Sequence, residues 1–419
     1  MGMKKTQIGM IPEEWDAQSF SDTFRILNNN TYSRAELNYD SGQFRNIHYG
    51  DVLILFPEVL DCTREDVPYI NDGVRISSSA QPLQDGDVVM ADTAEDETVG
   101  KVTEVTNTSD KPVMAGLHTI PFRVKSGEFV PKWLGYYMNS HLYHDQLLPY
   151  IHGTKVSSVS KGSLGDTVII VPKTSEQEKI VNALSDVDAL IEDLKKLIRK
   201  KKDVRQGTMQ RVLTGKNRLQ GFSSEWKDTT LGNICDIKDG THQTPHYVES
   251  GIPFYSVETV TNDDFTHVKY ISLEEHERLT SSYKIENGDV LMTRIGSIGK
   301  GKYVDWNPNA SFYVSLALLK FRGNKPLANF IALLTGTEEF QKEAELHSLQ
   351  FAIPMKINLG QISDIRVRIP AEDSEIKAII TMLNDMGSEI KRLEQKLNKY
   401  KLLKQGMMEE LLTGKVRLM

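Results

Sequence analysis

Apolar residues recur at alternating steps of four and three in two long stretches of the chain. The first stretch carries Ile180, Leu184, Val187, Ile191, Leu194 and Ile198, and the second carries Ile379, Leu383, Met386, Ile390, Leu393, Leu397 and Tyr400. This spacing is typical of a coiled-coil seam, because it keeps one apolar stripe facing a partner helix. We therefore predict two long helices that pack on each other antiparallel and serve as a spacer. The alternative, that each stripe faces the core of an ordinary helical domain, stays open.

The two predicted helices belong to an internal repeat. Residues 176–219 align without a gap on residues 375–418 at a constant shift of 199, and about 17 of the 44 positions are identical. The repeat ends in nearly the same phrase, LTGKNRL at 213–219 and LTGKVRL at 412–418. Weaker matches precede it: Glu14-Trp15 with Glu225-Trp226, and Gly86-Asp87-Val88 with Gly288-Asp289-Val290. A repeat of this length predicts a molecule with pseudo-two-fold symmetry.

The order of the repeat is circular. After the first LTGK phrase the chain continues towards Trp226, whereas after the second it stops, and residues 9–15 resemble the missing continuation. We therefore expect the two termini to lie close together.

Each half mixes short strand-like runs with turns and short helices, which predicts an α+β fold. Strand-like runs end at Pro172 and Pro370, where the long helices begin. The predicted segments are a first domain at 1–171, a central helix at 172–220, a second domain at 221–369 and a C-terminal helix at 370–419. Aromatic helices near 133–138 and 330–334 are predicted to lie in the two cores.

The charge of the chain is unevenly distributed. The net charge is −7, but residues 172–220 sum to about +5, largely through Lys195, Lys196 and residues 199–202. This basic run is interpreted either as a solvated face or as a surface for DNA or an acidic partner. Two distant cysteines, Cys62 and Cys235, exclude a disulfide framework and suit a reducing cytoplasm. No apolar run is long enough to predict a membrane span.

Polar, glycine-rich loops are the candidate DNA contacts, since hydroxyls, amides, imidazoles and amines can meet phosphates and base edges. Ordinary hydrophilic loops are the alternative. The candidates are Thr241, His242, Gln243, Thr244 and His246; Arg294, Ser297, Lys300 and Lys302; and, in the first half, Lys155, Ser157, Ser158 and Lys161.

Motifs that carry catalysis are missing from the sequence. There is no GxxxxGK[ST] phosphate loop, no HExxH and no Asn/Asp-Pro-Pro-aromatic motif of amino-methylating enzymes. Pro245 argues against a helix that would present His242 and His246 to a metal. We therefore expect no catalytic centre, no metal site and no cofactor in this chain.

The combined pattern resembles the specificity subunit of type I restriction–modification enzymes, over the whole chain. The resemblance rests on the two helices that close in LTGK, on Trp15 and Trp226, and on the phrases at 288–291 and 295–300. It implies two target-recognition domains that each recognise half of a split DNA sequence, with the helices setting their separation.

The resemblance also implies partners. These are double-stranded DNA, two methyltransferase subunits docked on the helices, and restriction subunits that translocate DNA. S-adenosylmethionine, ATP and Mg²⁺ would serve those subunits. Three alternatives remain: a stand-alone methyltransferase or nuclease, a coiled-coil scaffold, and a DNA-binding subunit of another modification or defence system.

Overall fold

The computed structural model describes residues 2–64, 66–153, 156–349 and 351–418. The chain forms two compact units: a first unit of residues 1–194 with 396–419, and a second unit of residues 195–395. Each unit therefore combines one domain with half of each long helix. The division of the chain into the four segments expected from the sequence stays a prediction.

The first unit contains two main sheets. The larger has the strand order β4 (Phe24–Ile26), β13 (Thr119–Val124), β9 (Val88–Ala91), β11 (Val102–Thr106) and β7 (Val59–Asp61). The smaller has the order β12 (Val113–Ala115), β6 (Arg45–Ile47), β8 (Tyr69–Ile70) and β5 (Leu37–Asn38). The two-stranded sheets are β1 (Met3–Thr6) with β2 (Gly9–Pro12), β3 (Asp16–Ser19) with β15 (Val168–Val171), and β10 (Thr93–Ala94) with β14 (Ser157–Ser158).

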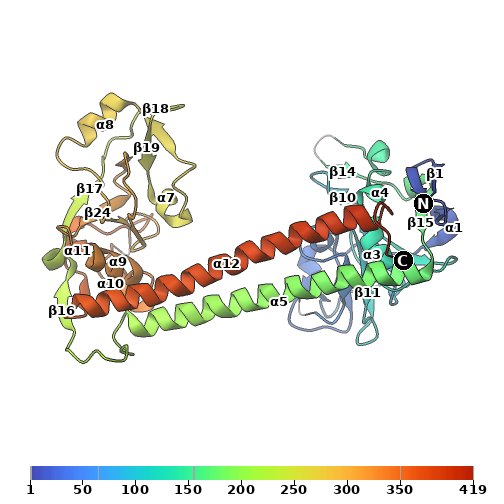
Figure 1. The fold of residues 1–419 in the computed structure, drawn as a ribbon, viewed down its shortest axis with the longest axis horizontal. Coiled ribbons are helices and arrows are strands. Elements are labelled where there is room, and N and C mark those ends of the chain that lie inside the picture. Colours follow the sequence, from blue (N-terminus) through green and yellow to red (C-terminus); the bar gives the residue numbers. More distant parts are fainter. Residues whose placement is uncertain (1, 65, 154–155, 350, 419) are drawn as a thin grey trace. The chain divides into compact units, whose positions relative to one another are not determined.

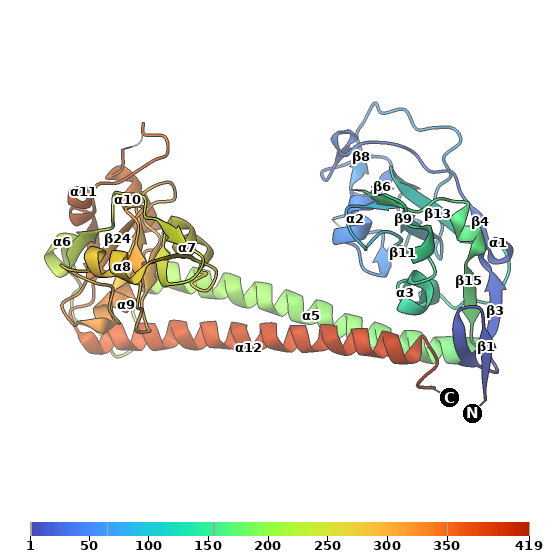
Figure 2. The same ribbon diagram turned by 90° about the horizontal axis from the view of Figure 1, so that it is seen from above.

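Short helices cover these sheets. They are α1 (Phe20–Thr23), α2 (Tyr49–Ile54), α3 (Trp133–Met138) and α4 (His141–His144). Helix α3 packs against β11 (Figure 2). Its aromatic residues Trp133, Tyr136 and Tyr137 are buried in the largest apolar cluster of the unit, as the sequence predicted.

The second unit also contains two main sheets. One has the order β17 (Asp236–Asp239), β24 (Leu316–Lys320), β21 (Val290–Thr293) and β22 (Gly301–Tyr303). The other has the order β18 (Tyr247–Val248), β20 (Lys269–Ile271), β19 (Ile252–Tyr255) and β23 (Ser311–Phe312). Strand β16 (Lys227–Thr230) pairs with β25 (Arg366–Ile369). The short helices are α6 (Leu231–Ile234), α7 (Val257–Asn262), α8 (Leu273–Leu279), α9 (Lys325–Leu334), α10 (Glu338–Leu346) and α11 (Leu359–Ser363).

The two units share one topology. The order β4-β13-β9-β11 matches β17-β24-β21-β22, and the parallel pair β6-β12 matches β19-β23. The repeated Gly-Asp phrase has the same role in both. Asp87 accepts the Gln84 N–H and pairs with Arg123, while Asp289 accepts the Glu286 N–H and pairs with Lys320. The internal repeat predicted from the sequence is therefore confirmed in three dimensions, and this phrase is structural.

The two long helices are α5 (Thr174–Val212) and α12 (Asp373–Leu411), each of 39 residues. In the first unit, Ile180 and Leu184 of α5 share a core with Met408 and Leu411 of α12. In the second unit, by contrast, the end of α5 packs on the start of α12, through Met209, Val212, Ile376, Ile379 and Leu383. Within each unit the two helix halves thus run antiparallel, side by side (Figure 1). The predicted seam is confirmed, with Ile191, Leu194 and Ile390 buried and Leu393 half-buried.

Part of the basic run on α5 pairs with α12. In the second unit Lys201 lies 2.8 Å from Glu389 and Lys202 lies 2.7 Å from Glu394. These two lysines flank the seam, where they help to hold the helices in register. No helix in the described part of the chain is long and apolar enough to span a membrane.

In each unit, a glutamate buried in the first turn of a long helix binds side chains from two other segments of the chain. In the second unit the Trp226 indole donates to Glu375 at 3.2 Å, and Arg218 donates two hydrogen bonds at 2.6 and 2.8 Å. In the first unit the Trp15 indole donates to Glu176 at 2.9 Å. There the arginine is Arg417, which also forms two hydrogen bonds to the carboxylate. We call each Trp–Glu–Arg set a carboxylate clasp.

The clasp of the first unit joins the two ends of the chain. The segment before the clasp arginine turns at Gly414, with φ +71°, close against Pro12; its counterpart Gly215, with φ +72°, lies against the Trp226 ring. A side chain at Gly414 would collide with Pro12 as well as strain the backbone. The circular order predicted from the sequence is thus confirmed, because the C-terminal segment occupies in the first unit the place that residues 213–219 occupy in the second.

We expect Glu176→Ala to lower the free energy of unfolding by about 3–5 kcal/mol, since it leaves a buried arginine and an indole N–H without their partner. Glu178→Ala, on the exposed face of the same turn, is the matched control and should change stability by less than about 0.5 kcal/mol. Urea unfolding of the full chain measures both. Equal midpoints for the two variants would contradict the importance of the clasp.

A second buried carboxylate, Glu104 on β11, accepts the backbone N–H groups of Lys132 at 2.5 Å and Gly135 at 2.9 Å. Burial raises the pKa of Glu104 from 4.5 to about 7, against these hydrogen bonds. Between these pH values the folded chain holds a proton that the unfolded chain has lost, so the stability that Glu104 contributes falls as pH rises through this window.

Glu104→Gln should remove this dependence, because an amide does not ionise. Its single oxygen accepts one of the two N–H groups, so the variant loses a hydrogen bond and is less stable by an amount that does not change with pH. Stability measured from pH 4.5 to 8 should therefore decline for the native chain relative to the variant up to about pH 7 and run parallel above it. The exposed Glu95→Gln is the control and should follow the native curve. A constant difference across the whole range would show that the pKa of Glu104 is ordinary.

Candidate nucleic-acid interface

The polar loop after β17 presents several of the predicted DNA contacts. The side chains of His242, Gln243, Thr244 and His246 are exposed, and Thr241 is half-buried. Thr241 anchors the loop, because its N–H donates to Phe312 and its carbonyl accepts the Val314 N–H. We call residues 240–246 loop A. The Thr241 hydrogen bonds fix the backbone of loop A, while the hydrogen-bonding side chains of the loop are exposed.

Arg294 lies beneath loop A. Its side chain is only 8% exposed and pairs with Asp239, which precedes the loop. Its Nε also donates to the Ile357 carbonyl at 3.2 Å. The other Asp239 oxygen lies 2.8 Å from the His242 ring. In this conformation Arg294 holds loop A through Asp239, and the base contact predicted for it from the sequence stays a prediction.

Two lysines of the same glycine-rich stretch are also engaged within the unit. Lys300 donates to the Thr261 carbonyl at the end of α7 at 2.6 Å, and Lys302 donates to Asp263 at 2.6 Å. In the first unit Lys101 makes the equivalent bond to Leu53 at the end of α2, at 3.0 Å. In both units this lysine braces a short helix, and the DNA contacts predicted for Lys300 and Lys302 stay predictions. Ser297 stays exposed at the tip and stays a predicted contact.

A further loop, which the sequence did not indicate, belongs to this cluster. Residues 349 and 351–356, which we call loop C, form a small hairpin closed by the Leu349 N–H donating to the Lys356 carbonyl at 2.8 Å. Residues 294–299, loop B, hydrogen-bond to it through Gly296 and Met355. With Arg294 bound to Asp239 and Ile357, loops A, B and C form one connected cluster.

In the first unit the counterpart of loop C includes predicted contacts. Strand β10 pairs with β14, so that Ser157 and Ser158 lie beside the tip of the β9–β11 hairpin. Ser158 and Lys161 are exposed and Ser157 is half-buried, while Lys155 lies outside the described residues. Extending the internal repeat from 152–161 onto 347–358 would have identified loop C.

The first unit carries different chemistry where the second has loop A. The amide groups of Asn30 and Asn46 are buried and have no protein partner among the described residues. Nearby, Arg34 binds Asp51 with two hydrogen bonds, at 2.7 and 2.9 Å. Burial, and then the Arg34 charge, lowers the pKa of His48. Shared strands thus support unlike polar residues in the two units.

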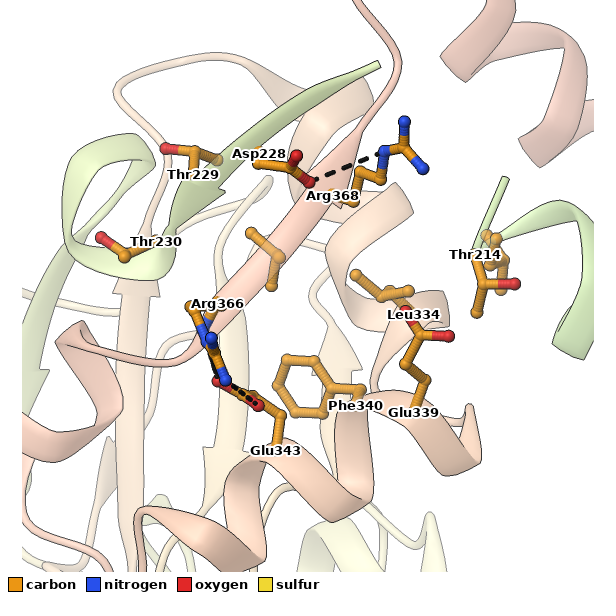
Figure 3. A pocket seen from close by; sticks show the side chains of 12 residues that line it. Thr214, Asp228, Thr229, Thr230, Leu334, Glu339, Phe340, Glu343, Arg366 and Arg368 are labelled. Atoms are coloured by element: carbon orange, nitrogen blue, oxygen red, sulfur yellow. Dashed lines mark hydrogen bonds and ion pairs between the residues drawn. The ribbon is translucent and has the colours of Figure 1, made fainter. Parts of the chain in front are cut away.

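The second unit also has a cavity of about 580 Å³ between α10, the β16–β25 pair and the end of α5. Figure 3 shows two ion pairs among the lining residues, Arg366 with Glu343 at 2.8 Å and Arg368 with Asp228 at 3.6 Å. The third carboxylate of the lining, Glu339, pairs with Lys216 at 3.3 Å. Paired side chains of this kind offer no free base or nucleophile to a substrate. Burial raises the pKa of both cysteines, Cys62 and Cys235, to about 12, so their thiols stay protonated and unreactive at neutral pH.

Comparison with known proteins gives consistent matches. A curated relative from Methanocaldococcus jannaschii, assigned as the type I restriction enzyme MjaX specificity subunit, is 23% identical over 441 aligned positions, which cover 99% of this chain and 96% of the relative. The MjaVIII specificity subunit of the same organism is 24% identical over 63% of this chain and 66% of its own length.

Two solved structures share the fold. The S subunit of a type I restriction–modification system from M. genitalium matches with a TM-score of 0.51 and 15% identity, over 96% of each chain. A chain from a study of complex assembly and conformational transition of the type I R-M system matches with a TM-score of 0.59 and 18% identity, over 97% of this chain and 99% of its own.

The profile of one protein family matches this chain twice. The family is described as the type I restriction modification DNA specificity domain, and the matches cover residues 12–202 and 223–401. Each match contains the two main sheets of one unit and much of the long helix that follows them. Membership agrees with the prediction of a non-catalytic specificity subunit. The chain therefore belongs to the type I restriction–modification DNA specificity family.

Proposed function

We propose that this specificity subunit recognises a two-part target in double-stranded DNA, with one part contacted by each unit, and that it docks two methyltransferase subunits on α5 and α12. The observation that carries the proposal is the combination of a shared scaffold with unlike loops. Both units have the same strand order and the same carboxylate clasp. The loops differ, however. The residue whose N–H donates to the end of β12 is Asn30 in the first unit, and the residue whose N–H donates to the matching strand β23 is Thr241 in the second. Two similar domains with different contact residues would recognise two different half-sites.

Loop A is the proposed contact surface of the second unit. Gln243 is exposed and offers an amide, which can pair with both hydrogen-bonding groups of an adenine edge. Thr244, His242 and His246 can donate to or accept from bases and phosphates. Arg294 and Asp239 would hold the loop in position, so that less conformational entropy is lost when DNA binds.

Helix α5 carries a second apolar stripe in addition to its seam. Leu190, Leu197 and Val204 are spaced by seven residues and are 46, 39 and 48% exposed. Heptad spacing places them on one face, where a helix of another protein could pack. We assign this face to a methyltransferase subunit. The restriction subunits, S-adenosylmethionine, ATP and Mg²⁺ would then belong to the assembled cytoplasmic complex, with the cofactors bound by the partners.

Gln243→Ala in the assembled complex should weaken DNA binding by about 1–3 kcal/mol and relax the preference at one target position. Binding to a panel of targets with single base changes measures both effects. Gln220→Ala, at an exposed position near the end of α5, is the control. A specificity profile that matches the native one at every position would remove Gln243 from the interface.

Leu197→Asp should prevent a methyltransferase subunit from docking, because it places a charge in an apolar helix contact. Lys196→Asp places an aspartate one position away, about 100° around the helix. It changes the charge by more than Leu197→Asp does, because it also removes a lysine, and it should still assemble. The mass of the purified complex in light scattering distinguishes the outcomes. Normal assembly of the Leu197 variant would exclude this face as the docking surface.

A further inference from the structure

The tip of loop C exposes large apolar side chains. Phe351 and Ile353 are 102 and 100% exposed, so neither packs on the rest of the chain. Leu346, where α10 ends, is 68% exposed. An apolar cluster of this kind on a protruding hairpin marks a contact with another molecule, because it contributes nothing to the core.

The base of this hairpin is firmly held although its tip is free. The Leu349 N–H donates to the Lys356 carbonyl at 2.8 Å, and the Ile357 N–H donates to the Arg294 carbonyl at 3.0 Å. Arg294 also binds Asp239 at the start of loop A. Loop C is therefore positioned by the same buried arginine that positions the proposed DNA-contacting loop, and its apolar tip belongs to the same surface.

The charge of this segment favours a polyanion as the occupant. Residues 346–358 contain Lys356 and His347 but no aspartate or glutamate, in a chain whose net charge is −7. The Lys356 side chain is exposed beside the apolar tip. An apolar tip flanked by a cation suits DNA, in which stacked bases lie between rows of phosphates.

We propose that Phe351 and Ile353 form a wedge that inserts between adjacent base pairs of the half-site contacted by the second unit. The phenyl ring stacks on one base and Ile353 fills the opened step, which makes an easily unstacked step part of the recognised sequence. The proposal rests on the proposed function. The matching segment of the first unit, residues 152–160, contains no aromatic residue, so the wedge acts on one half-site only.

The test uses the complex with its methyltransferase subunits and target duplexes that carry 2-aminopurine at each position of both half-sites in turn. Apart from any base that the methyltransferase subunits flip out of the duplex, the native complex should raise the fluorescence several-fold at one step of one half-site, and only this signal should depend on Phe351 and Ile353. The double variant Phe351→Ser with Ile353→Ser should lose this signal and bind about ten- to a hundredfold more weakly. Phe351→Trp should restore both, since an indole also stacks.

Two controls distinguish loss of the wedge from a general effect of the substitutions on the protein. Val156→Ser changes the half-exposed apolar residue of the matching segment and should leave the signal unchanged. The thermal unfolding midpoint of the double variant should equal that of the native chain, because both side chains are fully exposed.

The experiment distinguishes failure of the wedge proposal from failure of the proposed function. A native complex that does not bind its target would overturn the proposed function itself. Native binding with unchanged affinity and fluorescence in the double variant would refute the wedge alone. Loss of a methyltransferase subunit from the double variant would instead assign the tip to a protein contact and overturn the wedge.

Discussion

A glutamate buried in the first turn of a long helix is the interaction on which the rest of each unit depends. Glu176 and Glu375 each receive an indole N–H and a two-pronged arginine from segments distant in the sequence. A buried carboxylate is tolerated only when its lone pairs are satisfied, so the helix start, the domain entry and the LTGK segment must come together. The clasp thereby specifies which ends of the two helices meet.

The clasp also explains how one chain can form two similar units. In the second unit the arginine comes from the segment that directly precedes the domain, whereas in the first it comes from the far end of the chain. The interaction is the same although the connectivity differs. A further ionic contact at this end ties α12 to the first unit: Lys404 lies 2.6 Å from Glu58 and 2.7 Å from Asp188.

In each unit, the residues that support the proposed DNA-binding surface differ from the residues that would contact DNA. Strands, the Gly-Asp turns and the lysines that brace α2 and α7 recur in both units. Loops at the ends of these strands differ, because their exposed side chains do not affect the core. Basic residues of a glycine-rich loop also support the scaffold, since Arg294 and Lys300 bind carboxylate and carbonyl groups of the same unit.

The sequence by itself determined the long helices, their antiparallel seam, the repeat and its circular order, because these depend on periodicity and on local similarity over many residues. It also identified loop A, whose exposed polar residues lie between two strands. Only the tertiary structure decided which cations are buried, that loops A, B and C are joined through Arg294, and that the apolar tip of loop C projects from this cluster. The reason is physical. A side chain's partners here lie 55 to 63 positions away, and burial at that range depends on how strands pair and pack, which no local pattern records.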